Sequence, residues 1–509
     1  MKKILNSIQK HCEDMIINDN FITIRDKDIK SISLYLFLDL DCDVSSVVCL
    51  KEGEEFVIKY LYSYNKQDYF FIVEQRVTQS FESLSHEIPA LNWFERDIYD
   101  MFGLEPIGHP DFRALGIYPE NYPPNFHPLI DDKLQDNKNH SEYKYKDLDH
   151  EGVYQILVGP IHAGVIEPGH FRFSMAGEPI LQLEIRHFWK HRGIEKLCEN
   201  KSIEEVLNIA HKISGDNALS HALAFANCVE KICDIKIPEF AGYSRIIGAE
   251  LERVSCSLSD ISGIFQDVGY SLGAQNISAL KEDIMRLAKK LSGSRFFKNF
   301  IVIGGVNADI SSFHKEILGL LKMVEKKLKI FVDLMENSSS ILERLETTGE
   351  ISYKIVKDLS CVGFCSSASG RLNDFRKIHP YLLYDKLEFD SITLKSGDVS
   401  ARTKVKINHI LNSFSIIKAS FNHISLMQDK KISVSYSIKD GEAFGYAESN
   451  RGNIIDFVKI EGDKVVRFKP RDPSFLNWQA IQFAVLGDVI GDFPLTNKSL
   501  NLSYAGNDL

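Results

Sequence analysis

The sequence predicts an α+β protein: a small N-terminal α+β domain, followed by a mainly helical domain with β-hairpins at its edges. Three observations support this prediction. Short runs of alternating apolar and polar residues precede residue 117, a proline-rich and then strongly polar stretch follows, and long runs at helical spacing fill the middle of the chain. A chain of 509 residues is too long for one ordinary hydrophobic core, so at least two domains are expected.

The first unit, residues 1–117, is expected to contain an antiparallel sheet. Its alternating runs at Ser31–Leu38, Glu55–Tyr62 and Asp68–Val77 are typical of strands with one buried face. Near its end, Trp93–Pro119 is predicted to form an acidic helix end and a tight turn. On the residues alone, the role of that segment is structural.

A linker is predicted for residues 118–150. Four prolines between positions 119 and 128 precede the polar run DDKLQDNKNHSEYKYKDLDH, which has too few apolar residues for a core of its own. The second domain is therefore assigned to residues 151–509.

A β-hairpin is expected at the start of the second domain. Two short apolar runs, Tyr154–Val158 and His170–Met175, flank a segment rich in glycine and proline. The loop carries His162 and Glu167, and His170 follows it. A loop with titratable groups at its tip can present chemistry; the alternative is that the histidines cap the backbone of their own hairpin.

The rest of the second domain is predicted to be a helical bundle with a late group of strands. Apolar residues recur at helical spacing in Ser202–Lys231, Pro238–Ser262, Ala279–Leu291 and Phe313–Glu336. Strands are expected at Ile432–Ile438, Ala443–Glu448 and Lys464–Lys469, and a final helix at Ala480–Asp488.

Composition excludes several classes of function. The net charge of −10 argues against nucleic acid as a partner. No apolar run reaches the roughly eighteen residues of a membrane span, and the start MKKILNSIQKHCED is not a convincing signal peptide. The nine cysteines form no C-x-x-C pair, which is typical of reduced, buried thiols in the cytoplasm.

Two stretches of the sequence resemble a known family. GPIHAGVIEPGHFRF, followed by HRGIEK, closely resembles the first hairpin of the large subunit of formate-hydrogenlyase and hydrogenase-4 type hydrogenases, and less closely that of the complex I D subunit. WFERDIYDMFGLEPIGHPDFR resembles the signature of the complex I C subunit. The matching residues are Glu95, Arg96, Asp97, Asp100, Met101, Phe102, Gly103, Gly108, His109, Pro110, Asp111 and Arg113. The resemblance implies a C-like unit fused ahead of a D-like unit, with the C-like segment acting as an interface.

The resemblance also implies that a metal site has been lost. Ni–Fe relatives hold their metals with four thiolates, in an early R-x-C-G-x-C-x-x-x-H motif and a late D-P-C-x-x-C-x-D-R motif. These match KISGDNALSH, from Lys212 to His221, and the C-terminal NLSYAGNDL. The thiolate positions hold Ser214, Asn217, Ser503 and Gly506, and an arginine over the metal becomes Ser367. A nickel-free chain is expected.

In the complex I D subunit, the vacated cavity serves a quinone. By resemblance, His162 is the candidate contact to a quinone or another acceptor, but the family's partner tyrosine has no counterpart between Lys212 and His221. Lys212 replaces an arginine beside the iron–sulfur cluster of a neighbouring subunit. The candidate proton carriers, each with an ordinary hydrogen-bonded role as the alternative, are Glu167, Asp216, His221 and Asp508.

The implied function is that of a nickel-free core subunit in a complex I-like oxidoreductase. It would bind no cofactor itself and would pair with a small iron–sulfur subunit, a ferredoxin-like subunit and membrane antiporter-like subunits. Its place would be the cytoplasmic face of the inner membrane, where electron transfer would be coupled to ion translocation. The alternative is a scaffold subunit without chemistry of its own. An active hydrogenase would need ligands that the chain lacks.

Overall fold

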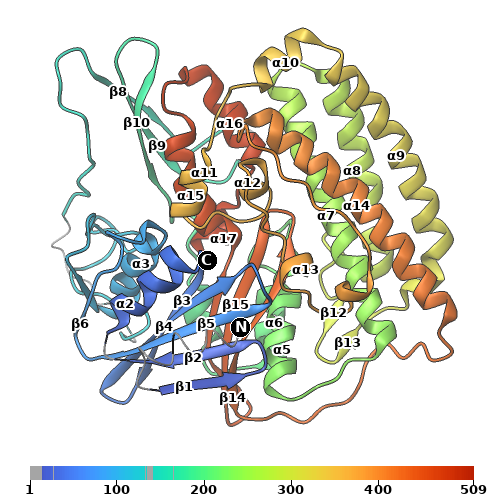
Figure 1. Ribbon diagram of the computed structural model, residues 1–509, viewed down its shortest axis with the longest axis horizontal. Coiled ribbons are helices and arrows are strands. Elements are labelled where there is room, and N and C mark those ends of the chain that lie inside the picture. The colour runs from blue at the N-terminus through green and yellow to red at the C-terminus, as the bar shows by residue number, and fades with distance from the viewer. Residues whose placement is uncertain (1–7, 9–13, 27, 132, 135–140, 164–165) are drawn as a thin grey trace.

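The computed structural model describes residues 8, 14–26, 28–131, 133–134, 141–163 and 166–509. It is an α+β structure, as predicted. In Figure 1 the N-terminal sheet lies at the lower left, a smaller sheet projects above it, and a helical bundle fills the right-hand side. The C-terminal helices, in red, lie between these parts.

The N-terminal sheet has five strands in the order β1-β2-β5-β4-β3. The pair β2–β5 is parallel and the other pairs are antiparallel, so the sheet is mixed where an antiparallel one was predicted. Its strands are β1 (Asp14–Asn18), β2 (Phe21–Arg25), β3 (Asp43–Glu52), β4 (Glu55–Tyr64) and β5 (Tyr69–Val77). A two-stranded ribbon, β6 (Ser80–Glu82) with β7 (Glu105–Ile107), lies beside it.

The strand predicted at Ser31–Leu38 is wrong, because this segment is helical. Helix α2 (Ile29–Leu34) runs into one π-helical turn over Tyr35–Asp39. The Asp28 carboxylate accepts a hydrogen bond from the Ser31 backbone N–H at 3.0 Å and caps the helix. The buried residues Ile29, Ile32 and Leu36 follow helical spacing.

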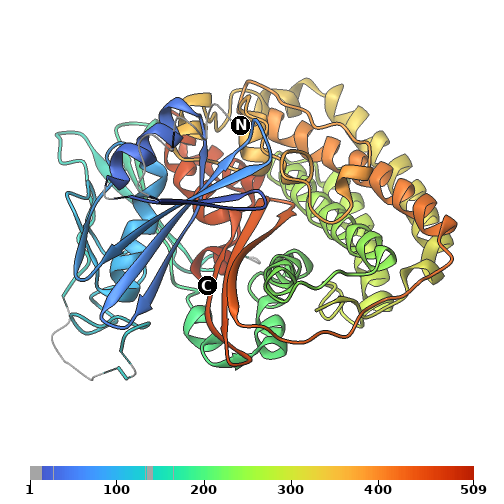
Figure 2. The same ribbon diagram turned by 60° about the horizontal axis from the view of Figure 1, so that its bottom comes forward.

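Both faces of the N-terminal sheet are covered. One face packs on α2 and α3 (Asn92–Phe102), which ends at Gly103 with φ of 76°. The other face packs on the C-terminal sheet, where Val48 and Phe70 share a hydrophobic cluster with Phe444 and Phe457. Figure 2 shows these two sheets against each other. Two-sided burial explains the long buried runs of β3 and β4.

The predicted hairpin is confirmed as β8 (Tyr154–Val158) and β9 (His170–Met175), to which β10 (Ile180–Arg186) adds a third strand. The C-terminal sheet has the order β11-β16-β15-β14. The predicted strand at Ile432–Ile438 is wrong: it holds only an isolated bridge from Ser433 to Gly305. The C-terminal strands are β11 (Lys201–Ser202), β14 (Gly441–Ser449), β15 (Gly452–Glu461) and β16 (Lys464–Arg471).

The helical bundle is confirmed, and α7, α8, α9 and α14 form it (Figure 1). The predicted helix Ser202–Lys231 is split into α5 and α6, and the predicted Ala480–Asp488 helix starts earlier, as α15. The helices are α4 (Ile194–Cys198), α5 (Ile203–Ala210), α6 (Ala218–Ile232), α7 (Glu239–Asp267), α8 (Ser271–Ser292), α9 (His314–Glu336), α10 (Ser339–Leu345), α11 (Tyr353–Asp358), α12 (Gly363–Ala368), α13 (Phe375–Ile378), α14 (Val399–Leu426), α15 (Pro473–Ala484), α16 (Phe493–Leu500) and α17 (Tyr504–Asp508).

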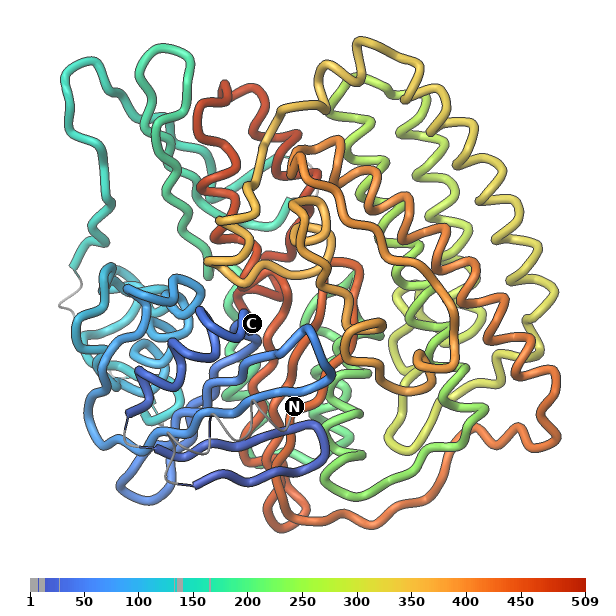
Figure 3. Tube along the Cα trace, viewed as in Figure 1, coloured from blue at the N-terminus to red at the C-terminus, as the bar shows by residue number. Residues whose placement is uncertain are grey.

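The described parts of the 118–150 segment contain no helix or strand, although Tyr118 is buried. In Figure 3 the trace after residue 141 rises along the left edge before it enters β8. The N-terminal unit and the second domain share hydrophobic clusters, and the proposed domain boundaries remain a prediction. None of the described helices is long and apolar enough to cross a membrane.

Candidate functional site

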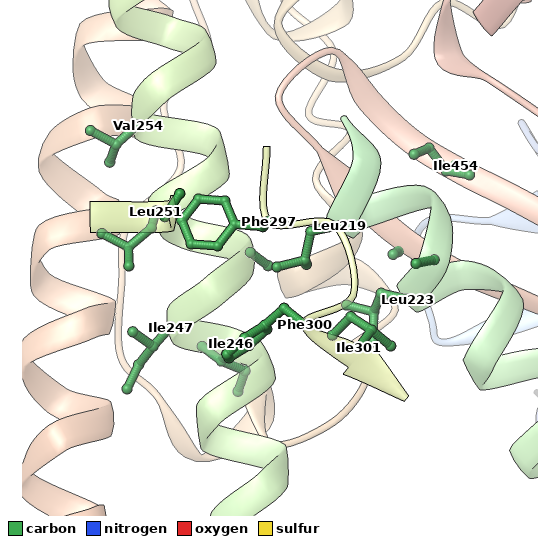
Figure 4. Close-up of a cluster of buried hydrophobic side chains, with 14 of the residues drawn as sticks. Leu219, Leu223, Ile246, Ile247, Leu251, Val254, Phe297, Phe300, Ile301 and Ile454 are labelled. Atoms are coloured by element: carbon green, nitrogen blue, oxygen red, sulfur yellow. The ribbon is translucent and has the colours of Figure 1, made fainter. Parts of the chain in front are cut away.

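The turn between α5 and α6 interrupts the predicted long helix at Ser214–Asn217. These four residues, SGDN, are poor helix formers. The turn rests on an apolar cluster in which Leu219 and Leu223 of α6 pack with Ile246 of α7 (Figure 4). A rigid base therefore holds the polar turn in place.

The C-terminal segment meets this turn. The Ser214 and Ser503 hydroxyls form a hydrogen bond of 2.9 Å, although the two residues are 289 positions apart. The Ser503 oxygen also accepts a hydrogen bond from the Gly506 N–H at 2.8 Å. Asn217 is fully buried beside them. The structure thus brings together the residues at the four positions where the resemblance places thiolates.

Arg451 fills the space between these residues. Its guanidinium forms an ion pair of 2.6 Å with Asp216, and it donates a hydrogen bond to the Asn217 side chain. Burial opposes ionisation of Asp216, but the Arg451 charge outweighs it and lowers the pKa of Asp216 to about 2. Asp216 is therefore the counterion of Arg451. The sequence analysis did not name Arg451 as a site residue.

His221 and Asp472 form a second buried pair at the site. The His221 Nε2 lies 3.0 Å from the Asp472 carboxylate, and both side chains are fully buried. Burial would raise the pKa of Asp472, but the hydrogen bond with His221 holds it below its usual range. A Cβ on Gly506 would lie 2.4 Å from the Asp472 carboxylate. Asp472 thus takes the space that a side chain at position 506 would need.

An open cavity of roughly 300 Å³ lies in front of this network, and we call it the Glu167 cavity. The Glu167 carboxylate accepts a hydrogen bond from the Ala505 N–H at 3.0 Å, and Lys190 lies 3.8 Å from its other oxygen. The polar residues of the lining are Glu167, Ser214, Asp216, Arg451, Asn497, Lys498, Asn501, Ser503 and Tyr504.

Tyr504 is a site residue that the sequence analysis missed. Its side chain is buried and lines the Glu167 cavity, and its hydroxyl lies beside the Asn497 side chain. Burial raises its pKa, so the hydroxyl keeps its proton. The clue in the sequence was that Tyr504 directly follows Ser503, an expected thiolate position.

The first hairpin contributes Glu167 but not His162 to the cavity lining. The His162 Nε2 lies 2.7 Å from the Gly169 carbonyl oxygen, and the His170 Nδ1 lies 3.3 Å from that of Gly159. The ring of His162 also packs against Gly159, which has φ of 84° and no room for a Cβ. Both histidines therefore bond to their own hairpin.

Asp508 and Lys212 lie at the margins of the site. The Asp508 carboxylate is fully buried and accepts a hydrogen bond from the Lys190 N–H at 2.9 Å. Burial raises the pKa of Asp508 to about 7. The Lys212 side chain is exposed, and its carbonyl oxygen accepts a hydrogen bond from Arg192. Neither residue lines the Glu167 cavity.

Two protein families match the chain. The family described as the 30 kDa subunit of respiratory-chain NADH dehydrogenase matches residues 22–138, and the 49 kDa subunit family matches residues 267–436. The chain is a fusion of complex I 30 kDa and 49 kDa domains. The resemblance in the sequence is thereby confirmed.

Relatives of this fusion protein occur in several enzymes. It is 28% identical to formate hydrogenlyase subunit 5 of Escherichia coli K12, over 84% of the chain and 77% of the relative. It is 27% identical to hydrogenase-4 component G of the same bacterium, over 85% and 76%. It is 28% identical to the C/D subunit of the NADH-quinone oxidoreductase of Phocaeicola vulgatus, over 73% and 75%.

A solved structure supports the fold of the fusion protein. A chain of the membrane-bound sulfane sulfur reductase, an archaeal respiratory membrane complex, superposes with a TM-score of 0.66 at 25% identity. The match covers 70% of this chain and 99% of that one. The protein is therefore a core subunit of the kind found in complex I-like and hydrogenase-related membrane complexes.

Proposed function

We propose that the chain is the nickel-free core subunit of a complex I-like oxidoreductase, and that its Glu167 cavity receives the electron acceptor, a quinone or another oxidant. The observation that carries this proposal is that the residues at the expected thiolate positions meet around Arg451 beside an open cavity. These residues are Ser214, Asn217, Ser503 and Gly506. By the resemblance in the sequence, this cavity would lie where Ni–Fe relatives hold their metals.

A Ni–Fe centre does not fit these residues. Bridging a soft metal pair takes thiolates, whereas serine and asparagine offer neutral oxygen and glycine offers no side chain. The guanidinium of Arg451 would also repel a metal cation. Among the described residues, no group of three or more His, Cys, Asp or Glu side chains is placed to hold a metal ion.

The residues present suit the reduction of an oxygen-bearing acceptor. The Tyr504 hydroxyl, which lies beside Asn497, would donate a hydrogen bond to an acceptor oxygen in the cavity that it lines. Arg451 supplies a fixed positive charge where negative charge develops on the acceptor as electrons arrive. Glu167 is partly exposed at the cavity mouth and can pass a proton from solvent to the acceptor. The electrons would come from an iron–sulfur cluster of a partner subunit.

The proposed setting is a peripheral position on the cytoplasmic face of the inner membrane. A small iron–sulfur subunit, a ferredoxin-like subunit and antiporter-like membrane subunits would complete the complex and couple the reaction to ion translocation. The relatives support this setting because their names place them in formate hydrogenlyase and NADH-quinone oxidoreductase.

A scaffold role is the second candidate. The observation that favours it is that Asp216 already neutralises Arg451, while His162 bonds to its own loop instead of facing the cavity. A scaffold subunit would support assembly of the complex, but substitutions in the cavity would leave turnover unchanged.

The test uses the native complex and the Tyr504→Phe variant. Elemental analysis of the wild type is expected to find no stoichiometric nickel. In Tyr504→Phe, KM for the acceptor is expected to rise about tenfold, because one hydrogen bond to the acceptor is lost. The free energy of unfolding should fall by no more than about 1 kcal/mol, since the hydroxyl meets only the Asn497 side chain. Stoichiometric nickel would refute the proposal, and an unchanged KM would favour the scaffold.

A further inference from the structure

A larger cavity plays no part in the proposed function. It has a volume of roughly 620 Å³ and lies where the turn between β1 and β2 meets the end of α6, the start of α7 and β14. It therefore lies between the N-terminal unit and the second domain. Among the described residues, it shares no part of its lining with the Glu167 cavity. We call it the Lys231 cavity, after the lysine in its wall.

Lys231 is a partly buried cation without an anionic partner. Within the described structure its ammonium forms no hydrogen bond and no ion pair, and its Nζ lies 3.7 Å from the centroid of the Phe21 ring. By contrast, the three buried lysines of the described chain, Lys59, Lys406 and Lys469, each form an ion pair. The ring face compensates the Lys231 charge only in part, so the ammonium can still pair with a ligand.

The Lys231 ammonium faces the cavity, because the groups that act on it also line the cavity. Phe21 lies beneath it, and the Asp19 carboxylate acts on its charge. The Lys231 nitrogen is not one of the enclosed, unpaired side-chain nitrogens of the described chain, so part of its surface is open. Burial lowers the pKa of Lys231, and Asp19 opposes that shift. An anion bound in the cavity would stabilise the ammonium further.

The acidic side chains of the lining do not neutralise Lys231. One of the four, Asp19, is exposed and forms no ion pair with a described residue. The other three are paired with basic residues that lie outside the lining. These pairs are Glu230 with Arg245, Asp234 with Lys439, and Glu239 with Lys386.

The charge and shape of the lining favour one class of ligand. Among its described residues there is no arginine, so the bidentate fork typical of phosphate sites is missing. Apolar side chains, among them Ile235, Leu383 and Tyr446, form much of the remaining wall. The volume lies within the range of about 300–1,000 Å³ that is usual for small-molecule sites. We propose that the Lys231 cavity binds a small carboxylate with an apolar body, whose carboxylate group pairs with Lys231.

Binding at the Lys231 cavity does not depend on the proposed function. It requires no electron transfer and no partner subunit, so it can be measured with the isolated full chain. A carboxylate that instead entered the Glu167 cavity would meet Lys498, which lines that cavity, and would keep its affinity when Lys231 is substituted. The two sites are therefore distinguishable.

Calorimetric titration of the full chain provides the test, with 4-phenylbutyrate as the probe and its uncharged amide, 4-phenylbutyramide, as the matched ligand. The acid is expected to bind with one-to-one stoichiometry and the amide about tenfold more weakly, because only the acid pairs with the ammonium. Lys231→Met should weaken binding of the acid about tenfold for the same reason. Asp19→Asn should tighten it about threefold, because an exposed like charge is removed.

Lys236→Met is the matched control. Lys236 is the other lysine of the lining, but its side chain is exposed. Both lysine variants should keep the melting temperature, and only Lys231→Met should lose affinity, with Lys236→Met within twofold of wild type. The proposal is overturned if the acid shows no saturable binding up to about 1 mM, if the amide binds as tightly, or if the two lysine variants have equal affinity. Weaker binding by Asp19→Asn, an exposed position, would also overturn it.

Discussion

The first hairpin loop and the C-terminal segment border the same cavity, but they relate to the family sequence in opposite ways. The loop has the family's sequence motif. Of its two candidate site residues, however, Glu167 lines the cavity and His162 bonds to Gly169. The C-terminal segment lacks the cysteines that the resemblance would place there, yet it supplies Ser503 and Tyr504 to the lining. The hairpin motif thus indicates how the loop folds. The side chains that line the cavity decide what the cavity can bind.

The largest expected effect concerns Arg451, on the side of the cavity where the expected cysteines are absent. Arg451→Met leaves Asp216 without its counterion and the Asn217 side chain without its donor. We expect a loss of about 3 kcal/mol in the free energy of unfolding, at the low end for a broken buried pair because Asp216 is partly exposed. Chemical denaturation of the isolated chain measures it. Lys354→Met, at an exposed pair, is the control and should change stability by less than about 0.5 kcal/mol.

The next prediction concerns the residue that the hairpin does supply. Glu167→Gln keeps the shape and removes the proton, so turnover of the assembled complex should fall about 100-fold while assembly is unchanged. Glu178→Gln, in the exposed turn at the opposite end of the sheet, should have normal turnover. Full activity of the Glu167 variant would remove it from the proton path.

The ionisation of Asp508 makes the stability of the protein depend on pH. Its folded pKa of about 7 lies above the ordinary value, so between about pH 4 and 7 the unfolded chain has released a proton that the folded chain keeps. This group therefore lowers stability as pH rises through that range. Relative to wild type, Asp508→Asn should gain up to about 1.4 kcal/mol per pH unit from pH 4 to 7, and no more above it. Parallel stability curves in denaturant titrations would contradict this.

The smallest expected effect concerns His162, which is hydrogen-bonded to its own hairpin. His162→Ala removes the hydrogen bond to Gly169 and should cost about 1 kcal/mol of stability, with KM for the acceptor within twofold of wild type. A rise in KM of tenfold or more, at unchanged stability, would show that His162 turns toward the acceptor during turnover.

Local patterns predicted the parts of the fold that depend on local interactions. Both strands of the first hairpin have their predicted bounds, and α9 begins within one residue of its prediction. The strand predicted at Ser31–Leu38 was wrong because its alternating apolar residues also fit a helix that starts two residues earlier, with Asp28 as its cap. Glycine and short polar residues around Gly215 broke the long helix predicted from Ser202.

The site depends on contacts that no local pattern encodes. Asp216 and Arg451 are 235 positions apart, and only the packed structure shows that they pair. Asp216 could therefore be named as titratable, but its counterion could not. Tyr504 was overlooked because the expected tyrosine was sought on the helix that begins near Lys212, whereas the structure brings one in from α17.

The shared cluster between the N-terminal and C-terminal sheets has a consequence for biosynthesis. Val48, Phe70 and Ile72 leave the ribosome roughly 380 residues before Phe444, Ile455 and Phe457, which cover them in the finished molecule. At about 5–20 residues per second, this sheet face stays uncovered for roughly 20–80 s. During that interval the nascent chain presents an apolar surface that a chaperone can shield, so production of the fused protein is expected to depend on chaperone capacity more than production of a chain ending before the second domain.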